Sequence, residues 1–242
     1  MTNTNDDLQS KISEAVAFFW RARINQAEKQ NKLGTRDQGS RGAVTGGTQM
    51  DGFIGLIAEI IKSAGINDAD IFLKRALELP GYFRPTKEWD LLVVKDNQLL
   101  IAMEAKSQVG PSFGNNFNNR TEEAMGSALD LWTAYREGAF NKTVKPWLGY
   151  FFMLEDCARS QIPIRVKEPH FEVFPEFKGA SYATRYEIFC RKLLRERHYN
   201  ATCFLTSDRD GGLNGNFSEP AEDLKFDIFT KSLNAQILTY GK

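Results

Sequence analysis

The sequence of 242 residues has few of the features that mark secreted, metal-finger or membrane proteins. Its three cysteines, Cys157, Cys190 and Cys203, are odd in number and far apart. That spacing fits neither a disulfide framework nor a zinc motif, and it suits a reducing compartment. No apolar run is long enough to span a membrane, and the polar start MTNTNDD does not resemble a signal peptide. We therefore expect a cytoplasmic protein without membrane contact.

The chain also lacks an excess of either charge, because 31 basic residues balance 31 acidic ones. This balance argues against a nonspecific binder of polyanions, although it allows a locally basic cleft. The two histidines, His170 and His198, show neither metal-ligand spacing nor a nucleophile partner, so we expect them to be structural or exposed. There are no internal repeats. The length suffices for a substantial core, and we expect one domain over 1–242.

The chain is organised around the stretch Trp89–Ser107, WDLLVVKDNQLLIAMEAKS. Two apolar runs, Leu91–Val94 and Leu99–Met103, flank the polar residues 95–98. Asp and Asn are good turn formers, so this pattern predicts a β-hairpin with buried faces.

Three charged residues lie at one end of this apolar hairpin. If Lys95 pairs with Leu99, Asp90 falls directly opposite Glu104. Because side chains alternate along a strand, Glu104 and Lys106 share a face, and Asp90 joins them there.

Carboxylates on facing strands repel each other unless a cation lies between them. Mg²⁺ suits such oxygen ligands and can activate a bound water near a phosphate. Lys106 could then hold the attacking water or help to deprotonate it. The alternative is an ordinary salt bridge at the end of a sheet, which the spacing fits equally well.

The pattern Asp90…Glu104-Ala105-Lys106 resembles the PD-(D/E)xK nuclease superfamily, with Trp89 where the motif's name has Pro. The segments RPTKEWDLLVV and EAKSQVGPSFGNNFNNRTEEA and the overall length resemble the XhoI-type type II restriction endonucleases. The resemblance covers most of the chain, and the Gly/Asn-rich stretch is its most specific part. It implies a homodimer that cuts both strands of DNA at 5′-CTCGAG-3′, after the first C, with Mg²⁺ as cofactor. It also implies 5′-phosphate ends and a cognate methyltransferase that acts on the same site.

The resemblance assigns roles to individual residues. It makes Asp90 and Glu104 the metal ligands, with the Ala105 carbonyl as a third, and Lys106 the residue that orients water. In the superfamily a glutamate on the helix before the hairpin often faces the metal. Glu59, beside the apolar stripe of the expected helix 53–64, is the candidate here. Otherwise it is an exposed helix residue.

Two segments are candidates for DNA contact. Residues 107–120 read as a recognition loop next to the cutting site, because amide and guanidinium groups read bases in the major groove. They are Gln108, Asn115, Asn116, Asn118, Asn119 and Arg120. The alternative is that Asn and Gly simply form turns. The Gly-rich segment 34–52 reads as a loop whose Arg36 and Arg41 follow the DNA backbone, or else as a solvated loop.

The remaining pattern completes an α/β fold with a central mixed sheet flanked by helices. Periodicity predicts helices at 7–32, 68–79, from 121, at 182–197 and from 218, and strands at 147–154 and 201–206. The segment 159–180 reads as an irregular excursion, a small subdomain or an arm. A nuclease for repair or recombination that reads DNA shape, and a DNA-binding module without catalysis, remain as alternative functions.

Overall fold

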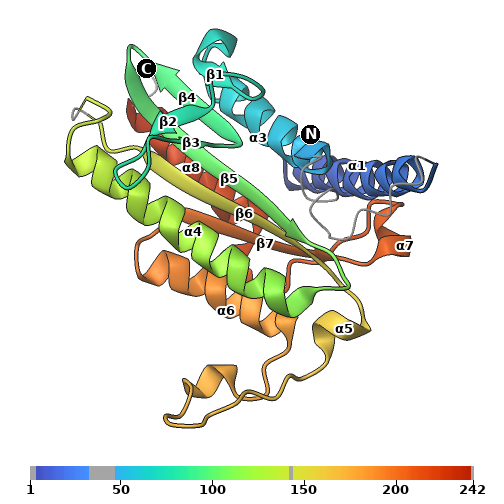
Figure 1. Ribbon diagram of the computed structural model, residues 1–242. Helices are drawn as coiled ribbons and strands as arrows, with labels where there is room; N and C mark the ends of the chain where they lie inside the picture. The colour runs from blue at the N-terminus through green and yellow to red at the C-terminus, as the bar shows by residue number, and fades with distance from the viewer. Residues whose placement is uncertain (1–3, 33–46, 142–143, 241–242) are drawn as a thin grey trace.

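The structure, a computed structural model, describes residues 4–32, 47–141 and 144–240. Its centre is a mixed sheet of five strands in the order β1-β4-β5-β6-β7 (Figure 1). Strands β1, β4 and β5 pair antiparallel, whereas β5, β6 and β7 pair parallel. The strands are β1 (Ile71–Phe72), β4 (Leu91–Lys95), β5 (Gln98–Gln108), β6 (Trp147–Glu155) and β7 (Ala201–Ser207). The α/β class with a central mixed sheet is therefore confirmed.

Helices cover both faces of this sheet (Figure 1). One face carries α1 (Thr4–Lys32), α3 (Asp51–Ser63) and α8 (Phe226–Tyr240), and the other carries α4 (Phe113–Arg136) and α6 (Tyr182–Arg195). A hairpin of β2 (Glu78–Pro80) and β3 (Thr86–Glu88) forms a second, small sheet. The short helices are η1 (Gly47–Met50), η2 (Asp68–Asp70), α5 (Ala158–Gln161), η3 (Pro175–Phe177), α7 (Arg209–Gly212) and η4 (Glu222–Leu224). Among the described residues no helix is both long and apolar enough to cross a membrane.

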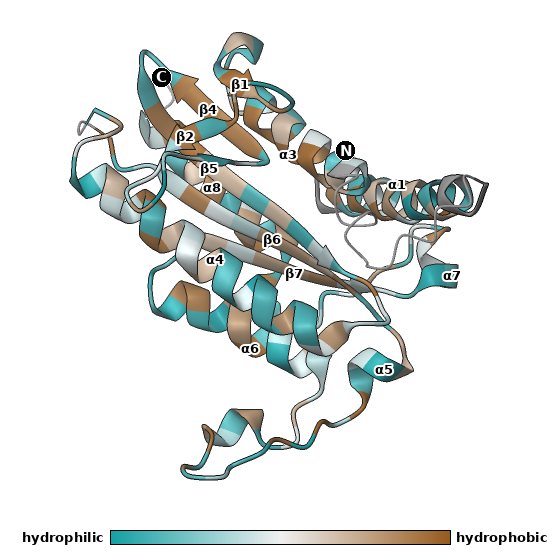
Figure 2. Cartoon of the chain, viewed as in Figure 1, coloured by the Kyte–Doolittle hydropathy of each residue, from teal (hydrophilic) through white to brown (hydrophobic). Residues whose placement is uncertain are grey.

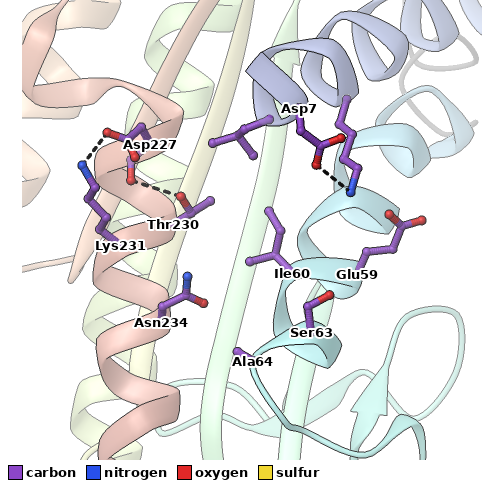
Figure 3. A pocket seen from close by; sticks show the side chains of 11 residues that line it. Asp7, Glu59, Ile60, Ser63, Ala64, Asp227, Thr230, Lys231 and Asn234 are labelled. Atoms are coloured by element: carbon purple, nitrogen blue, oxygen red, sulfur yellow. Dashed lines mark hydrogen bonds and ion pairs between the residues drawn. The ribbon is translucent and has the colours of Figure 1, made fainter. Parts of the chain in front are cut away.

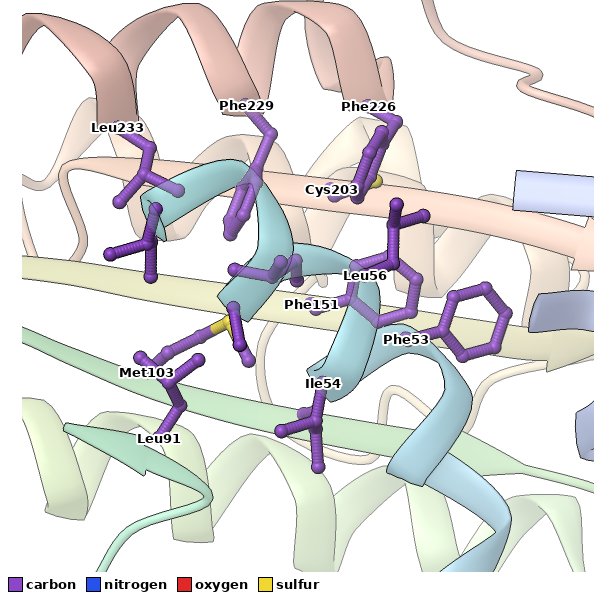
Figure 4. Close-up of a cluster of buried hydrophobic side chains, with 14 of the residues drawn as sticks. Phe53, Ile54, Leu56, Leu91, Met103, Phe151, Cys203, Phe226, Phe229 and Leu233 are labelled. Atoms are coloured by element: carbon purple, nitrogen blue, oxygen red, sulfur yellow. The ribbon is translucent and has the colours of Figure 1, made fainter. Parts of the chain in front are cut away.

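Alternation along the strands divides the apolar side chains between two cores. Met103 and Phe151 face α3 and α8, where they pack with Phe53 and Phe229 (Figure 4). The neighbouring strand positions face α4 and α6. Every residue of β6 is buried, as expected for a central strand covered on both faces. The apolar strands under more polar helices are visible in Figure 2. A charged side chain on such a strand is costly unless it is paired.

Three of the expected boundaries are wrong. Residues 68–79 form a 3₁₀ turn and two short strands rather than a helix, because β1 adds to the edge of β4. The last helix begins at Phe226, not at 218. The Glu219 carboxylate accepts a hydrogen bond from the Phe226 amide at 2.7 Å, and so caps the helix from outside. The third is α4, which begins at Phe113 rather than at Thr121.

Candidate active site

The hairpin closes with a tighter turn than the sequence suggests. Lys95 pairs with Gln98 rather than with Leu99, around the two residues Asp96 and Asn97. Both turn residues have positive φ, at 50° and 58°, as two-residue hairpin turns require. The expected pairing at the tip is therefore wrong.

A register shift at Val93/Val94 then restores the expected alignment at the other end. Leu91 pairs with Met103, so Asp90 lies beside Glu104 just before β4 begins. A bulge of this kind adds one residue to one strand and shifts every later pair by one.

The three charged side chains of the hairpin meet at one ammonium group. Lys106 Nζ lies 3.0 Å from Glu104 Oε1 and 3.7 Å from Asp90 Oδ2. The amide of Ala105 donates a hydrogen bond to Asp90 Oδ2 at 2.8 Å and ties the first acid to the strand that carries the second. Both carboxylates thus face the same positive charge.

Glu104 is buried, with 2% of its surface exposed, and it has three polar partners. Besides Lys106, Lys87 Nζ on β3 lies 3.1 Å from Glu104 Oε1. The Tyr199 hydroxyl donates to Glu104 Oε2 at 3.4 Å. Burial alone would raise the pKa of Glu104, but the two lysines outweigh it and lower that pKa. Glu104 is therefore a carboxylate at neutral pH.

Burial and neighbouring charges also determine the pKa of Lys106, but each acts in the opposite direction. Burial alone would lower its pKa, but the charges of Glu104 and Asp90 outweigh burial and raise that pKa. Lys106 is thus a protonated donor in this arrangement, which favours orienting a water over deprotonating one.

A hollow of about 300 Å³ lies where β5 extends beyond its paired partner β4. The pairing of the two strands ends at Leu91 and Met103, but β5 continues to Gln108 beside β6 only. Residues of α1, η1 and the start of α4 line the hollow together with those of β5. Three cationic side chains line it, Arg23, Lys106 and Arg120, together with Asp90. Such a basic, strand-edge hollow suits a phosphodiester.

The asparagine-rich segment does not form the expected loop, because Asn115 to Arg120 make up the first two turns of α4. Asn116 and Arg120, one helical turn apart, line the hollow. Asn115, Asn118 and Asn119 are exposed. Arg120 Nη1 pairs with Glu123 at 2.6 Å, while its buried Nε–H has no partner among the described residues.

The other predicted DNA contacts are placed differently. Gln108 is buried, and its amide group donates to the carbonyl of Val109 at 2.7 Å rather than pointing outward. Arg36 and Arg41 lie outside the residues that the structure describes.

Comparison with known proteins identifies the chain. The family model of restriction endonuclease XhoI matches residues 29–219. The chain belongs to the XhoI restriction endonuclease family. It is 56% identical over 209 residues to the type II restriction enzyme BstVI of Geobacillus stearothermophilus, covering 84% of this chain and 93% of that enzyme. No solved structure matches the chain.

Two further relatives are type II restriction enzymes. The XhoI enzyme of Xanthomonas vasicola is 50% identical over 182 residues, which cover 74% of this chain and 72% of the relative. The AbrI enzyme of Azospirillum brasilense is 52% identical over 166 residues, which cover 68% and 74% of the two chains. The predicted enzyme class, a type II site-specific deoxyribonuclease, is therefore confirmed. Such enzymes act on double-stranded DNA and generally need a divalent metal ion.

The structure does not place Glu59 in the hollow that Asp90 and Lys106 line. Glu59 is exposed on α3 and lines a separate hollow with Lys11 and Asp227 (Figure 3). Its helix meets the sheet through the opposite face, where Phe53 and Ile57 are buried. In the described part of the chain no three His, Cys, Asp or Glu side chains gather around one point.

The donor set nevertheless fits a hard divalent cation. Asp90 and Glu104 supply two carboxylates that already converge on a positive charge, the ammonium of Lys106. Mg²⁺ is commonly bound through one or two carboxylates, with waters and neutral oxygens completing an octahedron.

Sequence reasoning missed two residues at this site. Lys87 lies in the segment RPTKEWD that carries the family resemblance, but a lysine two residues before Trp89 has no signal of its own. Gln49, which is buried at the hollow, falls in a segment that reads as a loop. The spacing of Gly and polar residues there gives no indication that one side chain is enclosed.

Proposed function

We propose that this enzyme makes Mg²⁺-dependent double-strand cuts at 5′-CTCGAG-3′, after the first C, and leaves 5′-phosphate ends. The target and the cut position come from the family resemblance. The chemistry is supported by one observation: Asp90 and Glu104 share the Lys106 ammonium at the edge of a basic hollow.

Asp90, Glu104 and the Ala105 carbonyl would hold the Mg²⁺. When bound, this ion acidifies a coordinated water and offsets the charge that develops on the phosphate. Protonated Lys106 donates a hydrogen bond to the attacking water and orients it for in-line displacement. Lys87 pairs with the same oxygen of Glu104 as Lys106 does, and it helps to keep this buried acid ionised.

The start of α4 supplies the DNA contacts in this proposal. The unpaired Nε–H of Arg120 donates to a non-bridging oxygen of the scissile phosphate, since a buried donor without a partner favours an anion. Asn115, Asn118 and Asn119 present amides on the exposed helix surface, where a groove can receive them. Arg36 and Arg41 contact the DNA backbone, and Gln108 supports the segment between β5 and α4 from within.

The palindromic target calls for a two-fold arrangement, so we propose a homodimer with one site for each strand. Each subunit is a single endonuclease domain over 1–242, with 159–180 as an arm. A host of this enzyme needs a methyltransferase that modifies the same sequence.

A digest of plasmid DNA tests the proposal. Plasmid with a known number of CTCGAG sites is incubated with Mg²⁺ or with EDTA, and the ends are sequenced. We expect discrete fragments with 5′-TCGA overhangs in Mg²⁺ and intact plasmid in EDTA. A smear indicates a nuclease that reads shape, and intact plasmid in both samples indicates a binding module. Either result contradicts the proposed function.

A further inference from the structure

One residue that lines the hollow has a buried amide oxygen without a hydrogen-bond partner among the described residues. Gln49 on η1 is 8% exposed, and its Oε1 has no donor among the residues that the structure describes. An amide oxygen is only an acceptor, and leaving it buried and unsatisfied costs stability. Such an atom in a folded protein calls for an explanation, and an ion bound at the site is one.

The position of Gln49 indicates which ligand. It lines the same hollow as Asp90 and Ala105, and η1 packs against β5, the strand that carries Glu104 and Lys106.

The cation needs neutral oxygens besides its carboxylates. The described residues offer no third acidic side chain at this point, so two carboxylates leave most of an octahedron to carbonyls, amides and waters. We propose that Gln49 Oε1 is a ligand of the divalent cation, supplied by the turn that precedes α3. The inference rests on the proposed metal role of Asp90. It assigns the ligand to Gln49, just before the start of α3, instead of to Glu59 further along that helix.

The test measures cation binding directly, by following the electron paramagnetic resonance signal of free Mn²⁺ during titration of the full-length protein without DNA. Mn²⁺ prefers octahedral oxygen ligands, as Mg²⁺ does. We expect Gln49→Met to weaken Mn²⁺ binding about tenfold or more. Gln49→Glu should tighten it, because added ligand charge raises affinity. In EDTA the thermal midpoint of Gln49→Met should equal or exceed that of the parent, since an unsatisfied oxygen is removed.

Gln108→Met is the matched control, because Gln108 is a buried glutamine in the same hollow whose amide is already bonded to Val109. It should lower the thermal midpoint in EDTA and leave Mn²⁺ affinity at the parent value. Parent-like Mn²⁺ affinity in Gln49→Met overturns this inference alone, provided that Asp90→Asn abolishes binding. If Gln49→Met does not fold, Gln49→Glu decides, and parent-like or weaker Mn²⁺ binding overturns the inference. Absence of Mn²⁺ binding by the parent overturns both this inference and the metal role of Asp90.

Discussion

The amide of Ala105 donates to Asp90 Oδ2 at 2.8 Å, so the acid that follows the end of β3 is fixed to the strand that carries Glu104. The contact joins two residues 15 positions apart. Because it uses only an acceptor oxygen, an uncharged amide at position 90 can keep it. The geometry and the charge of Asp90 can therefore be separated by mutation.

We expect Asp90→Asn to fold like the parent and to cut at least about a hundredfold more slowly, because it keeps the bond to Ala105 but loses a charged ligand. Single-turnover cleavage of a duplex with one CTCGAG site measures the rate, and thermal unfolding in EDTA measures the fold. Asp68→Asn is the control, since Asp68 forms an exposed pair with Lys62 far from the site. Parent-like cutting by Asp90→Asn would contradict the assignment.

Substitutions of the two lysines that contact Glu104 should have different effects, one on the cleavage rate and the other on stability. Lys106 faces both acids, whereas Lys87 forms an ion pair with Glu104 but not with Asp90 among the described residues. Lys87 also donates to the carbonyl of Glu88 at 3.1 Å and packs over Trp89, 4.4 Å from the ring centroid. We expect Lys106→Met to slow cleavage at least about a hundredfold at saturating Mg²⁺. Lys87→Met should cut within about tenfold of the parent but lose about 1–3 kcal/mol in free energy of unfolding, because it removes a partner of a buried carboxylate. Urea unfolding and single-turnover rates on both variants make the comparison. Equal rate losses in the two variants would refute the distinction.

The hairpin is predictable from sequence because its signals are local. Two apolar runs around a polar turn determine its strands, and alternation places Glu104 and Lys106 on one face. The exact turn was not predictable, and the expected partner of Asp90 holds only because a bulge offsets the error at the tip. A register argument from loop length alone is thus open to errors of one residue.

The start of α4 shows where local signals fail. Gly and Asn disfavour helices, so the segment reads as a loop. In the structure Phe113 stacks on Tyr182 of α6 with 5.7 Å between centroids, and Phe117 meets Tyr186 at 5.0 Å. This packing between helices outweighs weak propensity, and a single sequence does not reveal it.

The position of Glu59 shows a different limit. Helical periodicity identifies which face of α3 is buried, but not which turn of the helix lies beside the start of β4. The residues just before α3 line the hollow, and Gln49 is buried there. Helical periodicity does not reveal that these residues lie at the hollow.

A second buried acid, Asp130, should make part of the stability depend on pH. Its Oδ1 accepts from the amides of Tyr82 and Phe83 at 2.7 and 2.8 Å, and its Oδ2 accepts from Arg84 Nε at 2.7 Å. Although burial alone would raise the pKa of Asp130, these bonds outweigh it and lower that pKa. A lowered carboxyl pKa stabilises the fold above the unfolded-state value of about 4, and this contribution is lost as pH falls through the folded pKa.

We therefore expect Asp130→Asn to lose about 1–3 kcal/mol at pH 6, because its amide would place a donor against Arg84. The difference from the parent should shrink as pH falls below about 4. Urea unfolding at pH 6 and pH 3 measures both values. Asp68→Asn serves again as the exposed control, with an expected change within about 0.5 kcal/mol. A difference that stays constant with pH would contradict the role of the ionised carboxylate.

The middle of α1, which carries Arg23 at the hollow, is held by a contact that a single methyl group should break. Trp20 Nε1 donates to Ser207 Oγ at 3.0 Å, and Gly212 lies so close that a Cβ there would collide with both side chains. We expect Gly212→Ala to lower the free energy of unfolding by about 1–3 kcal/mol, as overpacking does. It should also slow cleavage, because Trp20 precedes Arg23, which lines the hollow. Gly55→Ala on α3, where nothing lies within 4 Å of the added methyl, should instead stabilise by about 0.5–1 kcal/mol. Urea unfolding and cleavage rates on this pair measure the effect, and equal stability of the two variants would show that α1 is anchored elsewhere.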